Sequence, residues 1–227
     1  MTAEQFHFDL TPLATFRKEA FVVSQSNEAA WKLVNAWPEW PQAAICLVGP
    51  RASGKTHLLH IWADRVEAHI LRGSLLSEEN LLQLRHHKCI ALEEADEVVD
   101  QPAFFHLFNQ ISNSEGSLLM AARSEPARWS VDLPDLRSRL NTVPDVPIGS
   151  PDDALLGDLI KKQFEDRQVE VHQDVVSYMV NRIERSYGMA NRVVDRVDRD
   201  LWERGGPLTT LRVRRVLEDI AAEDAVE

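Results

Sequence analysis

The chain has 227 residues, of which 44% are hydrophobic and 27% charged, as expected of a globular protein with a sizeable core in one or two domains. Its formal net charge of -11 argues against direct, non-specific DNA binding, which requires a basic surface. No apolar run approaches the roughly 18 residues of a membrane span, and the N-terminus lacks the pattern of a signal peptide. We therefore expect a cytoplasmic protein without membrane contact, with Cys46 and Cys89 as buried thiols.

Residues 1–19 carry few helix or strand signals and are expected to form a tail. Helix-like and strand-like runs then alternate: helices are predicted at 26–37, 55–66, 78–85 and 102–113, and strands at 43–48, 68–71, 89–92 and 118–122. This alternation predicts an α/β domain at 20–147, with a parallel sheet covered by helices on both faces.

Pro144, Pro147, Gly149 and Pro151 cluster at the end of this region and mark a domain boundary. Beyond it, residues 148–227 are predicted to form a small all-α domain with helices at 152–168, 173–185, 189–204 and 209–222. Asp152 and its neighbours are a plausible N-cap for the first of these helices. Nine arginines between Arg182 and Arg215 form either a solvated surface with Arg–Asp pairs or a basic edge that faces a nucleotide or a partner.

Residues 49–56 read GPRASGKT, which fits the phosphate-loop pattern G-x-x-x-x-G-K-[ST] between a predicted strand and a predicted helix. The glycines allow backbone N–H groups to point at phosphate oxygens, and the helix dipole adds to this attraction. Lys55 is expected to reach the β- and γ-phosphates, and the Thr56 hydroxyl is expected to bind Mg²⁺.

An acidic run follows the strand predicted at 89–92, where phosphate-loop enzymes place a carboxylate that holds the Mg²⁺ shell. Glu93 takes this position, and Glu94 is the candidate for orienting water. Because Glu is one methylene longer than the usual Asp, its carboxylate is displaced by about 1.5 Å. We expect nucleotide and Mg²⁺ binding with weak intrinsic hydrolysis. The alternative is an acidic loop without a metal role.

Three segments together resemble the DnaA-type AAA+ family, over about residues 20–220. Residues 21–27 are similar to the segment that contacts adenine, residues 54–60 to the phosphate-loop helix, and residues 133–140 to the box that carries an arginine finger. The resemblance implies an AAA+ base domain with a helical lid, and ADP or ATP as ligand. The nucleotide contacts that it implies are Phe21, Val22, Val23, Asn27, Gly49, Pro50, Arg51, Ala52, Ser53, Gly54, Lys55, Thr56, His57 and, from the lid, Arg192, although Gly188 or Asn191 takes that last place in other alignments.

The layout of a short tail before an AAA+ module is similar to that of the Hda family of DnaA regulators. This resemblance implies a negative regulator of replication initiation, which in its ADP form stimulates hydrolysis of DnaA-bound ATP while attached to the sliding clamp, and so meets DNA indirectly. Arg139 would be the finger supplied to DnaA, unless it merely pairs with Asp135. The possibility of a homo-oligomer stays open.

The tail contains a segment similar to the clamp-binding hexapeptide: it begins with Gln5, has the apolar Phe8 fourth and ends with Leu10, and Phe6 is its second residue. The alternative for this segment is a terminal strand with Phe6 and Phe8 on one face.

Two other functions are weighed: an ATP-driven initiator or helicase loader acting on DNA, and a small-molecule kinase. The negative charge speaks against the first, and the matches to the DnaA-type segments speak against the second. The strand predicted at 118–122 ends in Ala121-Ala122-Arg123, where a polar sensor residue is common in the family, which again predicts weak hydrolysis.

Overall fold

A computed structural model describes Phe16, Lys18 and residues 21–224 of the chain. Gln5, Phe6, Phe8 and Leu10, which form the expected clamp-binding segment, lie outside the described residues. Within the described part, no helix combines the length and the apolar character that crossing a membrane requires.

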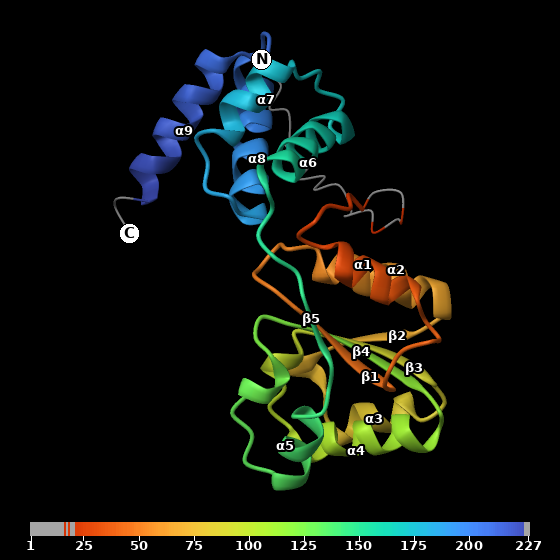
Figure 1. Cartoon of the computed structure of the whole chain (residues 1–227). Coiled ribbons are helices and arrows are strands. Elements are labelled where there is room, and N and C mark those ends of the chain that lie inside the picture. The colour runs from red at the N-terminus through yellow and green to blue at the C-terminus, as the bar shows by residue number, and fades with distance from the viewer. Residues whose placement is uncertain (1–15, 17, 19–20, 225–227) are drawn as a thin grey trace, which may run out of the picture.

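Five parallel strands form one sheet in the order β2 (His69–Arg72), β3 (Cys89–Glu93), β4 (Ser117–Ala122), β1 (Ala44–Val48) and β5 (Asp145–Pro147). Helices α1 (Glu28–Asn35) and α2 (Lys55–Val66) cover one face, and α3 (Glu78–Leu84), α4 (Gln101–Asn113) and α5 (Pro134–Leu140) cover the other (Figure 1). The predicted α/β architecture is therefore confirmed.

Strand β1 is buried on both faces, as expected of a central parallel strand. Its Ile45 and Leu47 belong to the core under α1 and α2, whereas Ala44 and Cys46 belong to the core under α3, α4 and α5. This period of two explains why the strand reads as a continuous apolar run. The end of β1 is thereby fixed between two cores, at the point where the phosphate loop begins.

Side chains that accept hydrogen bonds from backbone N–H groups mark the start of several helices. The Asp100 carboxylate accepts the Ala103 N–H at 2.9 Å before α4, and the Ser77 hydroxyl accepts the Asn80 N–H at 3.3 Å before α3. Three short 3₁₀ turns connect the elements: η2 (Gly73–Leu75), η3 (Ala95–Glu97) and η4 (Pro126–Arg128).

Four further helices, α6 (Asp153–Asp166), α7 (Gln173–Val180), α8 (Tyr187–Arg204) and α9 (Thr210–Asp224), pack around a hydrophobic core of their own. They lie beyond the sheet, at the end of the segment that follows β5 (Figure 1). Asp152 caps α6 as expected, because its carboxylate accepts the Leu155 N–H at 2.7 Å.

Two local predictions are wrong. Strand β5 was not predicted, because it has three residues and ends in Pro147; as an edge strand beside β1 it tolerates a residue without an N–H. Helix α7 ends at Val180 and not at Arg185. The Asn181 side chain donates to the Ser177 carbonyl at 2.8 Å at that end, and Ser186 caps the start of α8.

Candidate nucleotide-binding site

The phosphate loop makes a tight turn between β1 and α2. The Gly49 N–H donates to the Ala122 carbonyl at 3.2 Å, and a Cβ added to Gly49 would lie 2.6 Å from the Ile148 carbonyl oxygen. Gly54, which precedes α2, has a φ of 93°, a conformation that glycine adopts without strain. No described side chain caps the N-terminus of α2. The first N–H groups of this helix are therefore available to an anion.

The Lys55 ammonium is turned onto the loop itself. It donates to the carbonyls of Gly49 at 2.8 Å and Pro50 at 2.6 Å, and to the Ser53 hydroxyl at 3.3 Å. Burial lowers the pKa of Lys55, and the charge of Asp96 acts in the opposite direction. Phosphate oxygens would offer this ammonium stronger, charged partners than the carbonyls do.

The residues of the loop differ in their exposure to solvent. Ser53 is buried, whereas Pro50, Arg51, Ala52 and Thr56 are exposed. The Thr56 hydroxyl is thus accessible in the first turn of α2, as binding of a nucleotide-associated cation requires.

The segment expected to contact adenine lies against the phosphate loop. A Cβ added to Gly54 would meet Phe21 Cε2 at 3.2 Å, and the Phe21 ring also contacts the His57 ring edge-on at a centroid distance of 5.3 Å. On its other side Phe21 stacks on Trp31 at 5.3 Å. Val22 is half-buried and Val23 is exposed. The structure thus brings residues 21–23 and the loop together.

The Asn27 side chain is engaged with the backbone of its own segment. It is buried; its amide donates to the Val22 carbonyl and its oxygen accepts the Ser24 N–H, both at 2.9 Å. These bonds use the side chain to shape residues 22–24. Asn27 therefore organises the segment, and a contact of its side chain with the base stays a prediction.

The two expected acidic groups each lie close to a basic side chain outside the loop. Glu93 Oε1 lies 3.4 Å from His60 Nε2, in the second turn of α2. Glu94 has a left-handed backbone with a φ of 50°, and its carboxylate lies 3.6 Å from Arg72 Nε. Neither carboxylate is hydrogen-bonded to Thr56 among the described residues.

Asp96 is an acidic residue near the loop that sequence reasoning did not select. Its Oδ2 accepts the Arg123 N–H at 3.0 Å, and the Arg123 guanidinium pairs with Glu97 at 2.9 Å. Asp96 affects the pKa of Lys55, so the two side chains share one electrostatic environment. Its place three residues after Glu93, in the same acidic run, was the available signal.

The carboxylates fit a weakly held cation. Glu93 Oε1 and Asp96 Oδ1 are buried, and no described group donates a hydrogen bond to either oxygen. Residues 21–224 contain no group of three or more His, Cys, Asp or Glu side chains that could hold a metal ion by itself. This combination suits Mg²⁺, which keeps several waters and binds through one or two carboxylates together with nucleotide phosphates.

Arg139 lies on α5, on the opposite face of the sheet from α2 (Figure 1). Its guanidinium donates to the Asn109 side chain at 2.5 Å and lies 5.2 Å above the Phe105 ring, both on α4. Among the described residues it forms no ion pair with Asp135. The Arg139 side chain is therefore held by contacts with α4, and the residue is only partly buried.

Arg192, the expected lid contact, pairs with α9: its guanidinium lies 2.7 Å from Asp224 and 3.6 Å from Glu223. Most of the neighbouring arginines also pair with acidic residues, between helices or within one helix. Asp200 pairs with Arg204, Arg212 and Arg215, and Glu223 with Arg196. The basic cluster is thus largely neutralised within the helical unit.

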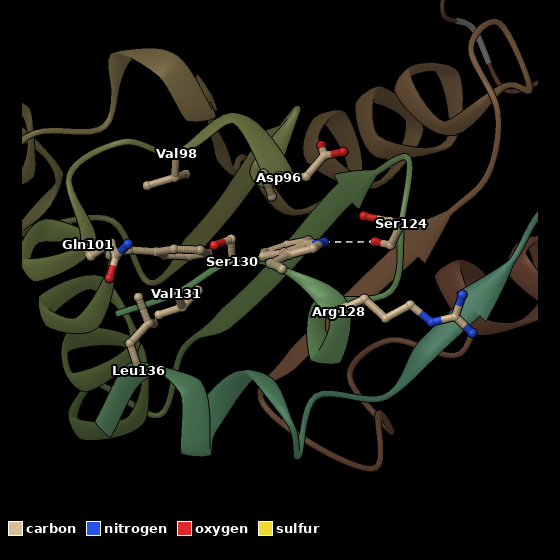
Figure 2. A pocket seen from close by; sticks show the side chains of 11 residues that line it. Asp96, Val98, Gln101, Ser124, Arg128, Ser130, Val131 and Leu136 are labelled. Carbon is tan, nitrogen blue, oxygen red and sulfur yellow. Dashed lines mark hydrogen bonds between the residues drawn. The ribbon is translucent and has the colours of Figure 1, made fainter. Parts of the chain in front are cut away.

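A cavity of about 300 Å³ lies between η3, η4, α4 and α5, with Asp96 in its lining. Trp129 is among the residues that line it, and its indole N–H donates to the Ser124 carbonyl at 3.0 Å. Figure 2 shows Arg128 pointing away from the cavity. None of the phosphate-loop residues lines this cavity. It is therefore separate from the nucleotide site.

No family model matches the chain. It is 24% identical over 182 residues to an uncharacterized protein of Haemophilus influenzae, covering 74% of this chain and 79% of that protein. It is 23% identical over 201 residues to the chromosomal replication initiator protein DnaA of Cutibacterium acnes, covering 77% of this chain but only 40% of that protein.

Among solved structures, domain III of Thermotoga maritima DnaA matches with a TM-score of 0.74 and 17% identity, over 90% of this chain and 96% of that chain. AMPPCP-bound DnaA from Aquifex aeolicus matches with a TM-score of 0.66 and 18% identity, over 83% and 65%. A RuvB mutant of Thermotoga maritima matches with a TM-score of 0.69 and 18% identity, over 87% and 70%. The chain therefore has the fold of an AAA+ domain, and its sequence is similar to that of the replication initiator DnaA.

Proposed function

We propose that this chain binds ADP or ATP with Mg²⁺ at the phosphate loop, as part of the control of DNA replication initiation. The observation that carries the proposal is the uncapped N-terminus of α2, with Lys55 beside it and the Phe21 ring against Gly54. The binding of AMPPCP by a DnaA of the same fold supports it.

The residues divide the work of binding. The N–H groups of the loop and of the first turn of α2 receive the phosphate oxygens, and Lys55 leaves the loop carbonyls to pair with phosphate charge. The Thr56 hydroxyl would hold Mg²⁺, which would supply positive charge to offset that of the phosphate oxygens. Phe21 and the segment that Asn27 shapes provide an apolar surface and backbone groups for the base.

The proposed role is that of an Hda-type regulator: in its ADP form and attached to the sliding clamp, the chain stimulates hydrolysis of ATP held by DnaA. Weak hydrolysis of its own nucleotide fits the positions of Glu93, beside His60, and Glu94, beside Arg72. Arg139 fits a role towards a second AAA+ protein, because it belongs to α5, which covers the opposite face of the sheet from α2. The proposed clamp contact rests on Gln5, Phe6, Phe8 and Leu10.

The alternative is an ATP-driven initiator or helicase loader, which the sequence similarity to DnaA itself favours. A loader that binds DNA directly would give tight, salt-dependent DNA binding without the clamp. The net charge of -11 makes this outcome unfavourable.

The decisive experiment follows the fate of ATP held by DnaA after addition of this chain, ADP and DNA-loaded clamp, with a control that omits the clamp. Conversion to ADP only when the clamp is present is the expected result. Arg139→Ala should keep ADP and clamp binding and lose the stimulation, and Gln5→Ala should lose clamp association and keep ADP binding. Arg128→Ala, which removes an exposed arginine paired with Glu125, is the matched control. Stimulation that survives Arg139→Ala would contradict the finger assignment.

A further inference from the structure

Three side chains from different parts of the chain form a continuous contact that ends at the acidic group of the nucleotide site. The Phe16 ring stacks on the His60 imidazole, with centroids 4.1 Å apart and an angle of 16° between the planes. His60 Nε2 lies 3.4 Å from Glu93 Oε1. The imidazole is therefore held between an aromatic ring and a carboxylate.

His60 stands four residues after Thr56 on α2, so that both side chains lie on the same side of the helix, one turn apart. One turn of helix is about 5.4 Å along the axis. The Glu93 carboxylate thus lies beside the second turn of α2, one turn beyond the hydroxyl that would bind the cation. Glu93 Oε1 accepts no hydrogen bond from the described residues, and the close approach of His60 Nε2 is its polar contact among them.

The Phe16 ring restrains the His60 imidazole by stacking on it. Its ring also meets His57 in the first turn of α2, with centroids 5.6 Å apart and the planes at 70°. One aromatic side chain therefore spans two turns of the helix. If Phe16 leaves, the His60 ring loses its stacking partner and regains rotational freedom.

We propose that His60 is a positioning residue that keeps Glu93 away from the cation of the nucleotide site, and that Phe16 keeps His60 in place. The inference rests on the proposed nucleotide site. Its consequence is that displacing the Phe16 ring from His60 also changes how strongly the site holds Mg²⁺.

The test is the ratio of ADP affinities with Mg²⁺ and with EDTA, measured by calorimetry. His60→Ala should raise this ratio about three- to tenfold, the range expected for one additional net interaction of Glu93. Phe16→Ala should raise it in the same direction by less. Adding Glu93→Gln to His60→Ala should cancel the gain. His106→Ala, which removes an exposed histidine on α4, and Glu97→Gln, which removes an exposed carboxylate, are the matched controls.

An unchanged or lower ratio in His60→Ala, or a gain that survives Glu93→Gln, would overturn the proposal. A second measurement separates this failure from failure of the nucleotide site. The ¹⁵N shifts of the His60 ring, recorded without nucleotide, should change in Glu93→Gln and in Phe16→Ala and stay unchanged in His106→Ala. If the unaltered chain does not bind ADP but the His60 shifts change in both variants, the nucleotide site is contradicted and the contact stands. If the shifts do not change in either variant, the contact itself is refuted.

Discussion

The Asp96 carboxylate accepts the backbone N–H of Arg123 at 3.0 Å, which ties the turn after β3 to the end of β4 beside the phosphate loop. The bond uses Oδ2 and leaves the buried Oδ1 without a donor among the described residues. One negative charge is thereby fixed near Lys55 at a site that must also receive phosphate. The charge of Asp96 and the charge of the ligand oppose each other unless a cation is present.

Asp96→Asn should therefore strengthen ADP binding in EDTA and reduce the additional gain that Mg²⁺ gives. The amide keeps an oxygen for the Arg123 N–H and removes only the charge, which is worth on the order of 1 kcal/mol, or about fivefold in affinity. Titration of ADP with and without Mg²⁺ checks this, with Glu97→Gln as the control on the neighbouring carboxylate. Weaker binding in EDTA would mean that Asp96 supports the ammonium of Lys55 more than it repels phosphate.

Asn27→Ala should lower both the free energy of unfolding and ADP affinity. The substitution removes two hydrogen bonds and leaves the Val22 carbonyl and the Ser24 N–H without their partner, a loss of about 1–3 kcal/mol. Urea denaturation and ADP titration measure the two effects. Full stability with a selective loss of adenine over guanine nucleotide binding would instead place the Asn27 side chain on the base.

The affinity for ADP should fall with rising pH earlier than an ordinary lysine would allow. Burial lowers the pKa of free Lys55 from 10.5, whereas phosphate charge raises the pKa in the complex. Binding then takes up a proton between these two pKa values, so affinity declines once the pH passes the lowered value. Titrations of ADP from pH 7 to pH 10 test the decline. Lys55→Arg, whose guanidinium stays charged, should bind with little pH dependence; the same decline in that variant would assign the effect to another group.

Gly49→Ala should destabilise the protein, because its methyl group would lie 2.6 Å from the Ile148 carbonyl oxygen and the backbone would have to move. A loss of about 1–3 kcal/mol is expected for such overpacking. Gly188→Ala is the matched control: an added Cβ on this glycine in the first turn of α8 meets nothing within 4 Å, so the substitution should stabilise by about 0.4–1 kcal/mol. Thermal unfolding of both variants compares the two effects, and equal stability of Gly49→Ala and the unaltered chain would refute the steric argument.

The unit from β1 through the phosphate loop to α2 could be predicted because its signals are local. The apolar run, the glycines and the periodic helix fall in one stretch, and the predicted helix 55–66 has the observed bounds. Strand β5 could not be found in this way, because its three residues become a strand only through pairing with β1. The domain boundary expected after residue 147 also depends on contacts between distant residues. Ile148, which follows that boundary, still packs in the core under α1 and α2.

The side chains of the site were less predictable than its backbone. That Glu93 turns to His60, and that Asp96 bonds the end of β4, are contacts between elements far apart in the sequence. Asn27 was selected for the right segment, but only the hydrogen bonds reveal that it shapes the backbone. Several arginines of α8 and α9 likewise pair with residues of another helix, such as Arg192 with Asp224 and Arg212 with Asp200, and the sequence alone did not specify these partners.

The chain that leaves the sheet is fastened twice before it reaches α6. The Ile148 N–H donates to the Val48 carbonyl at 2.7 Å, and the Gly149 N–H donates to the Ser26 carbonyl at 2.9 Å. Both bonds would have to break before residues 145–149 could swing. Only Ser150 and Pro151 then separate these two hydrogen bonds from Asp152, the N-cap of α6. A ligand that shifts the end of β1 or the segment shaped by Asn27 would therefore act on residues directly before α6.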